Sequence, residues 1–127
     1  MAEIGSIVGT TIRSLFNTPT IKATYVCHAN CIYITWVFSK EDTGYIIYRD
    51  GKEIFNGTIL EFQKAGNMFL PTDHNTNLFS KSHRELMYID TDIKKHKNYT
   101  YEVQAYKITD ARTSLSDKSI SYTVRTE

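Results

Sequence analysis

Asp90 and Asp92, separated by one threonine, are a pair of carboxylates close enough in sequence to suggest acid–base chemistry. Paired carboxylates catalyse reactions when their surroundings push their pKa values apart, so that one serves as acid and the other as base. Aspartates at this spacing ahead of a turn more often hydrogen-bond the backbone and form the turn. The sequence also lacks a glycine-rich phosphate loop, a Gly-x-Ser-x-Gly elbow and a His-Glu-x-x-His pair. We therefore predict no catalytic residues and no cofactor, and we expect that the protein is not an enzyme.

Scattered histidines and aspartates supply one further enzymatic alternative. A small hydrolase or metal enzyme would have to use Asp73, His74 and His83. These residues belong to none of the motifs named above, and we do not favour this alternative.

Cys27, His28 and Cys31 place two thiols and an imidazole close together. A structural zinc site needs four ligands, and the other three histidines lie in scattered polar segments, so the sequence predicts no metal site. If the flanking residues form two antiparallel strands, the cysteines face each other across a tight turn, where a disulfide can close a small ring. Two buried free thiols are an equal alternative.

The charges of the chain are balanced, with 15 lysines and arginines against 14 aspartates and glutamates. Basic residues concentrate only at residues 94–97 (KKHK), with Lys81, His83 and Arg84 upstream. Since no aromatic side chain is interleaved in the run to stack on bases, we interpret it as a solvated turn and predict no nucleic-acid partner. No apolar run approaches the roughly 18 to 20 residues of a membrane span, so we also predict no membrane partner.

Stretches with an alternation of period two, typical of β-strands, run through the middle and end of the chain. Ile32, Ile34 and Trp36 share one face of residues 31–37. Asp50-Gly51 separates YIIY from KEIF and indicates a two-residue hairpin turn, because glycine tolerates a positive φ. Further strands are predicted at residues 20–26, 45–50, 86–90, 98–106 and 119–126. About seven short strands in one chain of 127 residues, 41% of them apolar or aromatic, predict one antiparallel β-sandwich.

Two segments do not fit this pattern of short strands and turns, and both carry apolar residues that the core of the sandwich does not need. The first is an N-terminal arm, residues 1–18, in which apolar side chains recur at steps of three and four, as on one face of a helix. The second is an insertion at residues 58–85, which is longer than an ordinary connection. Since exposed apolar sets usually mark interfaces, we predict partner binding by Ile4, Ile7, Val8, Ile12, Leu15, Phe16, Met68, Phe69, Leu70 and Phe79. Packing of both segments against their own domain is the alternative.

The spacing of several features resembles that of the fibronectin type III domain, within the immunoglobulin-like sandwiches. The resemblance covers about residues 19–126, in which Pro19 opens the first strand and Trp36 takes the place of a core tryptophan in the second. Residues 44–51 (GYIIYRDG) are similar to the third strand and its turn. The most specific part is residues 93–105, where a leucine-like residue stands six before a tyrosine and a Tyr-x-Val-x-Ala alternation follows.

The resemblance implies roles for individual residues. A tyrosine at the position of Tyr99 buries its ring where the chain turns between sheets, and its hydroxyl bonds a backbone group upstream. Of the tyrosines in residues 98–106, only Tyr106 then remains available to a ligand. Together with the strand alternation, the resemblance implies a structural core of Trp36, Tyr45, Ile47, Ile93, Tyr99, Tyr101 and Val103.

We expect a non-enzymatic structural or adaptor protein, in which one fibronectin-III-like domain at residues 19–127 is fastened into a larger assembly by the arm and the insertion. A short chain that starts at Met, with no export signal and one such domain, looks like a virion component of a tailed bacteriophage: a tail, collar, baseplate or capsid-decoration subunit. Its partners would be other protein subunits, further copies of itself included. Its location would be the virion, assembled in the host cytoplasm.

The alternative is an extracellular carbohydrate- or protein-binding module of a secreted enzyme or adhesin. Under this alternative, Cys27 and Cys31 are bridged. Outward aromatic residues such as Tyr33, Tyr48 and Tyr106 would then form the contact surface.

Overall fold

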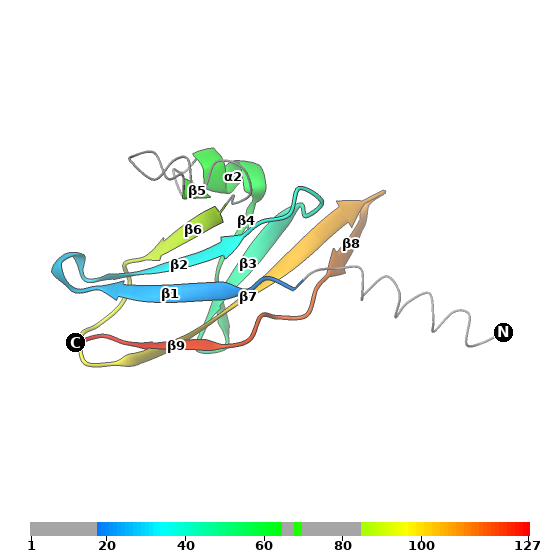
Figure 1. The fold of residues 1–127 in the computed structure, drawn as a ribbon. Helices are drawn as coiled ribbons and strands as arrows, with labels where there is room; N and C mark the ends of the chain where they lie inside the picture. The colour runs from blue at the N-terminus through cyan, green and yellow to red at the C-terminus, as the bar shows by residue number, and fades with distance from the viewer. Residues whose placement is uncertain (1–17, 65–67, 70–84) are drawn as a thin grey trace.

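The structure, a computed structural model, describes residues 18–64, 68–69 and 85–127. Two antiparallel sheets make up most of this part of the chain (Figure 1). The first sheet contains, in spatial order, β1 (Ile21–Val26), β2 (Cys31–Val37), β6 (Glu85–Asp90) and β5 (Met68–Phe69). The second contains β4 (Lys52–Thr58), β3 (Gly44–Arg49) and β7 (Asn98–Thr109), with β8 (Arg112–Leu115) and β9 (Tyr122–Arg125) paired to successive halves of the far edge of β7. The prediction of an antiparallel all-β chain is confirmed.

Two tight turns set the register of the second sheet. Asp50 and Gly51 have φ values of 52° and 83° and join β3 to β4, as the Asp-Gly pair predicts. Asp110 and Ala111, at 48° and 65°, form a similar turn between β7 and β8. The sequence indicated only a turn-rich connection there, because an Asp-Ala pair is a weak signal for positive φ.

The last strand of the second sheet is broken between β8 and β9, and two serines bridge the break. The backbone N–H groups of Ser116 and Ser119 donate to the carbonyls of Ala105 and Val103 at 2.9 and 2.8 Å. The serine hydroxyls accept from the N–H groups of the same two residues, each at 2.9 Å. The backbone of β7 therefore stays hydrogen-bonded across the break. The strand predicted at residues 119–126 is the shorter β9.

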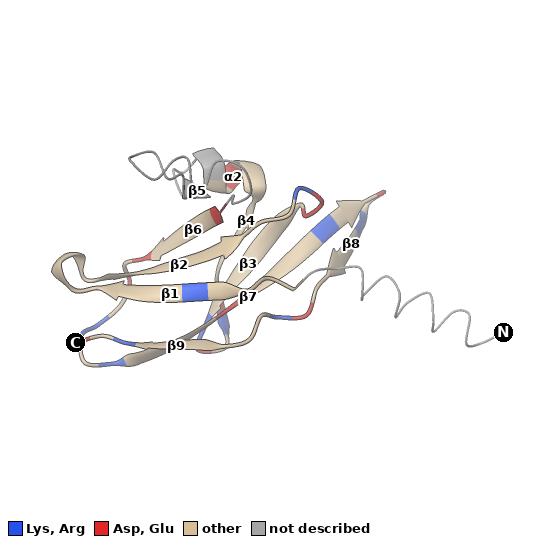
Figure 2. Ribbon diagram, in the orientation of Figure 1, with Lys and Arg blue, Asp and Glu red and all other residues tan. Residues whose placement is uncertain are grey.

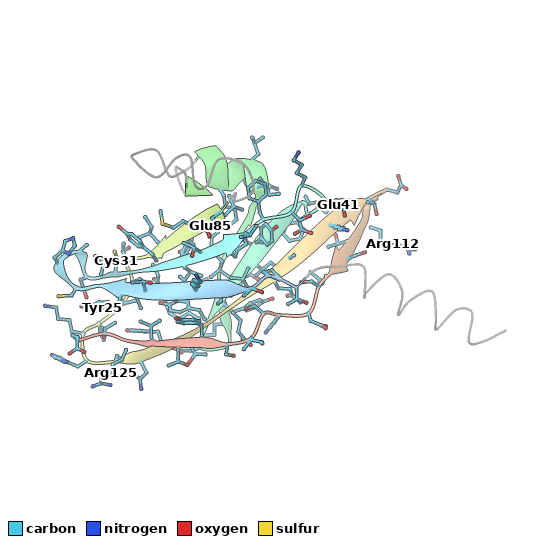
Figure 3. All side chains as sticks on the ribbon, viewed as in Figure 1. Tyr25, Cys31, Glu41, Glu85, Arg112 and Arg125 are labelled. Atoms are coloured by element: carbon cyan, nitrogen blue, oxygen red, sulfur yellow. The ribbon has the colours of Figure 1, made fainter. Side chains whose placement is uncertain are left out.

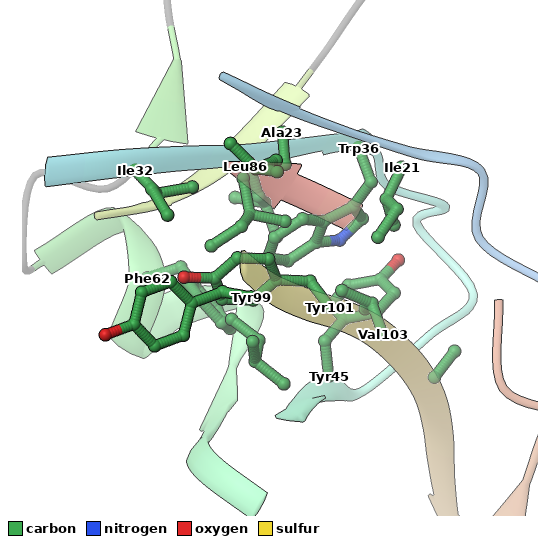
Figure 4. Close-up of a cluster of buried hydrophobic side chains, with 14 of the residues drawn as sticks. Ile21, Ala23, Ile32, Trp36, Tyr45, Phe62, Leu86, Tyr99, Tyr101 and Val103 are labelled. Carbon is green, nitrogen blue, oxygen red and sulfur yellow. The ribbon is translucent and has the colours of Figure 1, made fainter. Parts of the chain in front are cut away.

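The core lies between the two sheets and follows the alternation of the strands (Figure 4). Ile32, Ile34 and Trp36 of β2 are buried, as are Tyr101 and Val103 of β7, while the residues that alternate with them are more exposed. Trp36 meets Tyr45 of the other sheet at a ring-centroid distance of 5.4 Å, close to edge-to-face. The two sheets are thus joined by large side chains from central strands.

The segment predicted as a long insertion begins with a short helix, α2 (Ile59–Lys64). Thr58 and Glu61 form a capping box, since the Glu61 N–H donates to the Thr58 hydroxyl at 3.1 Å and the Thr58 N–H donates to the Glu61 carboxylate at 2.7 Å. Phe62 enters the core fully buried, with its ring 5.4 Å from Trp36 and 5.1 Å from Phe55. This part of the insertion belongs to the folded body.

Candidate interaction surface

Residues 18–20, which lead into β1, form a wall shared by two grooves. The first groove, of about 470 Å³, lies between this segment and residues 117–122 on the approach to β9. The second, of about 520 Å³, lies between the segment, the end of β2 and the turn before β3. Both grooves therefore lie where the predicted arm ends and the described part of the chain begins.

Two exposed apolar side chains line the first groove. Ile120 is 89% exposed and Tyr122 is 41% exposed, while Pro19 and Ile21 on the opposite wall are buried. Ile120 directly follows Ser119, which β7 holds by two hydrogen bonds, and it stands two residues before β9. Its backbone is therefore held on both sides, and its exposure follows from the break in the strand.

A buried carboxylate forms part of the second groove. Asp42 is buried and accepts a hydrogen bond of 2.6 Å from the hydroxyl of Tyr45, which itself accepts from the Ser39 N–H at 3.0 Å. Burial raises the pKa of Asp42, and the hydrogen bond from Tyr45 acts in the opposite direction. Burial together with the bond to Asp42 raises the pKa of Tyr45. Val37, half exposed, lines the same groove.

The chemistry of the two grooves suits binding of polypeptide. Apolar side chains on fixed backbone lose unfavourable contact with water when another apolar segment covers them. The hydroxyl groups of Thr18, Thr20 and Ser121 lie among the lining residues and can hydrogen-bond a partner's backbone.

The residues predicted to bind partners lie mostly beyond the described ranges. Residues 4–16 of the arm, Leu70 and Phe79 are outside them, as are Asp73, His74 and His83. Met68 and Phe69 form β5, whose backbone pairs with β6 at Leu86 and Glu85. Their role as partner-binding residues stays a prediction.

The residues predicted as structural core all lie in one buried cluster between the sheets. None of them is more than 8% exposed, and they are Trp36, Tyr45, Ile47, Ile93, Tyr99, Tyr101 and Val103. The Tyr99 hydroxyl accepts a hydrogen bond of 2.8 Å from the backbone N–H of Lys94, five residues upstream. Tyr45 alone of this set also lines one of the two grooves described above.

The prediction that Tyr106 is available to a ligand is wrong. Tyr106 is only 8% exposed, because its ring lies over Gly44 on the neighbouring strand. A Cβ at Gly44 would collide with this ring and with the carbonyl of Gly57, so the glycine makes room for the tyrosine.

Of the other tyrosines named for a contact surface, Tyr48 is also partly covered. The Lys118 ammonium lies 3.9 Å from its ring centroid, and its hydroxyl donates to Gln104 at 2.7 Å. Tyr33 is half-buried on β2.

The two cysteines are free thiols in this structure. Figure 3 labels Cys31 near Tyr25, at the end of the first sheet where β1 turns into β2. The turn between β1 and β2 contains a 3₁₀ helix, η1 (Cys27–Ala29), which leaves Cys27 exposed, whereas Cys31 is buried at the start of β2. The Tyr25 hydroxyl spans the turn and donates to the side chain of Asn30 at 3.2 Å. Of the two alternatives for this pair, the disulfide is not formed, and burial of both thiols is wrong for Cys27.

The two aspartates singled out at residues 90 and 92 have different surroundings. Asp90 is 2% exposed and accepts from the Tyr101 hydroxyl at 2.6 Å, from Arg49 at 2.9 and 3.0 Å and from the Asp92 N–H at 3.1 Å. The last bond is the expected turn, whereas the contacts to Arg49 and Tyr101 join the two sheets and could not be read from spacing. Asp92 is 95% exposed.

The basic run at residues 94–97 lies in the exposed turn between β6 and β7. Buried Thr126 holds this turn, because its hydroxyl donates to the Lys94 carbonyl at 2.6 Å and accepts from the Lys97 N–H at 2.9 Å. Figure 2 shows basic segments in this turn and on β9 near the C-terminus, while most acidic segments lie at turns and strand ends.

Sequence reasoning missed Ile120 and Tyr122. In residues 119–126 they alternate with serine and share parity with Val124, which is buried, so the pattern alone assigns all three to the core. Only the break bridged by Ser116 and Ser119 explains why Ile120 is exposed.

Residues 18–64, 68–69 and 85–127 contain no group of three or more His, Cys, Asp or Glu side chains that could hold a metal ion. Within the same ranges, no helix is long and apolar enough to cross a membrane. The chain matches no protein-family model, and no curated protein is significantly similar to it in sequence.

Proposed function

We propose that this protein is a non-enzymatic structural or adaptor protein that docks into a larger assembly through its N-terminal arm and its insertion. The observation that carries the proposal is the gathering of Val37, Ile120 and Tyr122, all exposed, around the grooves at the end of the arm. Apolar side chains exposed on a fixed backbone are typical of protein interfaces.

Association with the assembly is the property to measure. A full-length variant with Ile7→Asp and Ile12→Asp replaces two apolar arm residues by charges and should fail to co-sediment with the assembly. Ile108→Glu, at a site 51% exposed on β7 and outside both grooves, is the matched control and should co-sediment normally. Normal incorporation of the arm variant would contradict the proposal.

We propose further that the two sheets form a fibronectin-III-like sandwich. The order β1-β2-β6-β5 corresponds to the ABED order of immunoglobulin-like sandwiches, and β3, β7 and the β8–β9 strand correspond to CFG, with β4 added beside β3. The bond from the Lys94 N–H to the Tyr99 hydroxyl supports a tyrosine corner. An experimental structure with β1 and β6 in different sheets would contradict this assignment.

The assembly that we propose is the virion of a tailed bacteriophage or a related particle. This step rests on the analogy between small immunoglobulin-like domains and virion subunits. Particles purified from cells that make the protein should contain it at a fixed copy number after washing with high salt. Recovery of all the protein in the unassembled fraction would exclude this location.

A further inference from the structure

We propose that the turn between β1 and β2 is a site of reversible oxidation, in which the exposed Cys27 thiol reacts with a small disulfide and the buried Cys31 thiol then closes an intramolecular bridge. The oxidant is a low-molecular-weight disulfide of the glutathione type. Neither cysteine lines either groove, so this chemistry goes beyond the proposed docking function and does not depend on it.

The two thiols differ in their access to solvent. Cys27 is exposed, as are His28 and Ala29 beside it, whereas Cys31 is only 4% exposed. A thiolate exchanges with a small disulfide only where that disulfide can reach the sulfur atom. Cys27 is therefore the sulfur that reacts with a reagent from solution, and burial shields Cys31 from direct reaction.

The tight turn keeps the two cysteines close in space. Val26, which precedes Cys27, is the register partner of Cys31 in the last pair of β1 and β2. The carbonyl of Cys27, at the start of η1, accepts a hydrogen bond of 3.2 Å from the backbone N–H of Asn30. A disulfide needs Cα atoms about 4.4 to 6.8 Å apart, and a chain that turns back this tightly places Cys27 and Cys31 near that separation.

The surroundings of Tyr25 agree with this proximity. The Tyr25 hydroxyl donates to the side chain of Asn30 at 3.2 Å, within the same turn. Partial burial raises the pKa of this hydroxyl, and the negative charges of Cys27, Glu127 and Cys31 raise it further. Both sulfur atoms therefore lie within electrostatic range of one oxygen atom.

Few contacts oppose the small movement that Cys31 needs in order to reach Cys27. The 3₁₀ helix η1 contains no buried residue, and no side chain caps its start. Asn30 ends it in the left-handed region at φ 49°, which asparagine tolerates. Segments with few buried contacts open locally at a small cost in free energy, so the turn can expose the Cys31 sulfur without unfolding the sheets.

Both chemical steps are thiol–disulfide exchanges. In the first, the Cys27 thiolate attacks one sulfur of the small disulfide, a mixed disulfide forms, and the other half leaves and takes up a proton. In the second, the Cys31 thiolate attacks the Cys27 sulfur, the bridge between the two cysteines forms, and the second half leaves as a thiol. The two protein thiols are oxidised, and the small disulfide is reduced to two thiols.

The experiment exposes the full-length chain to glutathione disulfide, quenches the reaction with acid and measures intact mass and disulfide-linked peptides. The unmodified chain should lose both thiol hydrogens, retain no glutathione and yield a peptide pair joined through Cys27 and Cys31. Dithiothreitol should restore both thiols. Glutathione that stays on Cys27 of the unmodified chain, or links between the Cys27 residues of two chains, would overturn the proposal.

Two variants test the order of the steps. Cys31→Ser should accumulate the mixed disulfide at Cys27, because the resolving thiol is gone. Cys27→Ser should take up glutathione at least about tenfold more slowly, because its remaining thiol is buried. If serine at the buried position prevents folding, Cys31→Ala replaces it. Equal rates of uptake by the two variants would show that Cys27 is not the reacting thiol and would overturn the proposal.

Discussion

The hydroxyl of Tyr101 donates a hydrogen bond of 2.6 Å to the carboxylate of Asp90, and this bond joins the two sheets. Asp90 ends β6 in the first sheet, whereas Tyr101 lies on β7 in the second. Arg49, paired with Tyr101 in the register of β3 and β7, reaches the same carboxylate at 2.9 and 3.0 Å. Since a buried charge is tolerated only when it is paired and hydrogen-bonded, this polar contact between the sheets depends on all three side chains.

Arg49→Met should lower the free energy of unfolding by about 3 kcal/mol, because it leaves the buried carboxylate of Asp90 without its counter-ion. Tyr101→Phe should cost about 2 kcal/mol, the loss of one hydrogen bond to a charged group. Urea denaturation at neutral pH measures both. The control is Asp92→Asn, which removes the exposed second partner of Arg49 at 3.5 Å and should change stability by less than about 0.5 kcal/mol. Equal decreases in the free energy of unfolding for Asp92→Asn and Arg49→Met would show that the buried ion pair of Arg49 and Asp90 stabilises the protein no more than the exposed one.

Tyr99→Phe should lower the free energy of unfolding by about 1 kcal/mol, because the Lys94 N–H loses its acceptor while the ring stays buried. The folded variant should still associate with its partners, since Tyr99 lines neither groove. Thermal denaturation and a sedimentation assay on the same preparation test the two statements together. Lost association at an unchanged melting midpoint would show that Tyr99 is a binding residue.

Phe62→Ala should destabilise the protein by about 3 to 5 kcal/mol, because it opens a cavity beside Trp36 and Phe55. The matched control lies on the same helix: Leu60 is 58% exposed, and Leu60→Ala should change stability by less than about 0.5 kcal/mol. The comparison is made by chemical denaturation. Similar small effects for the two variants would mean that α2 packs only loosely on the core.

The raised pKa of Asp42 should make its contribution to the free energy of unfolding fall as pH rises. Burial raises its pKa in the folded state above the value of about 3.9 expected in the unfolded chain. Between these two pKa values the folded state binds more protons, so the contribution of Asp42 to the free energy of unfolding falls as pH rises through this window. Asp42→Asn cannot ionise, and its carbonyl can still accept from Tyr45.

The measurement for Asp42 is a series of denaturation curves from pH 3.5 upward for both chains. The stability of the unmodified chain relative to Asp42→Asn should decline as pH rises above about 3.9 and then level off. A difference that grows with pH would mean that the hydrogen bond from Tyr45 outweighs burial.

Strands and core were the most predictable features of this protein. The alternation in residues 31–37 and 98–106 predicts which side chains of β2 and β7 are buried, and the spacing between Ile93 and Tyr99 indicated the corner where the Tyr99 hydroxyl meets the Lys94 N–H. Tyr106 shows where alternation stops being informative, since it lies on the outer face of β7 and is nevertheless buried over Gly44.

The candidate site was much less predictable. Ile120 has the pattern of a core residue, and only the bonds that Ser116 and Ser119 make to β7 leave it at the wall of a groove. The ionic contact between Arg49 and Asp90 was equally hidden, because 41 residues separate the partners.

The all-β class, the Asp50-Gly51 turn and the identity of the core are readable from the chain alone, because alternation, turn chemistry and hydrophobic burial act over a few neighbouring residues. Three features emerge only in the folded molecule: Asp90 joins the two sheets, Phe62 of the insertion enters the core, and Ile120 is exposed beside residues 18–20. Each of these depends on which distant strands become neighbours, and that choice is made by the packing of the whole chain.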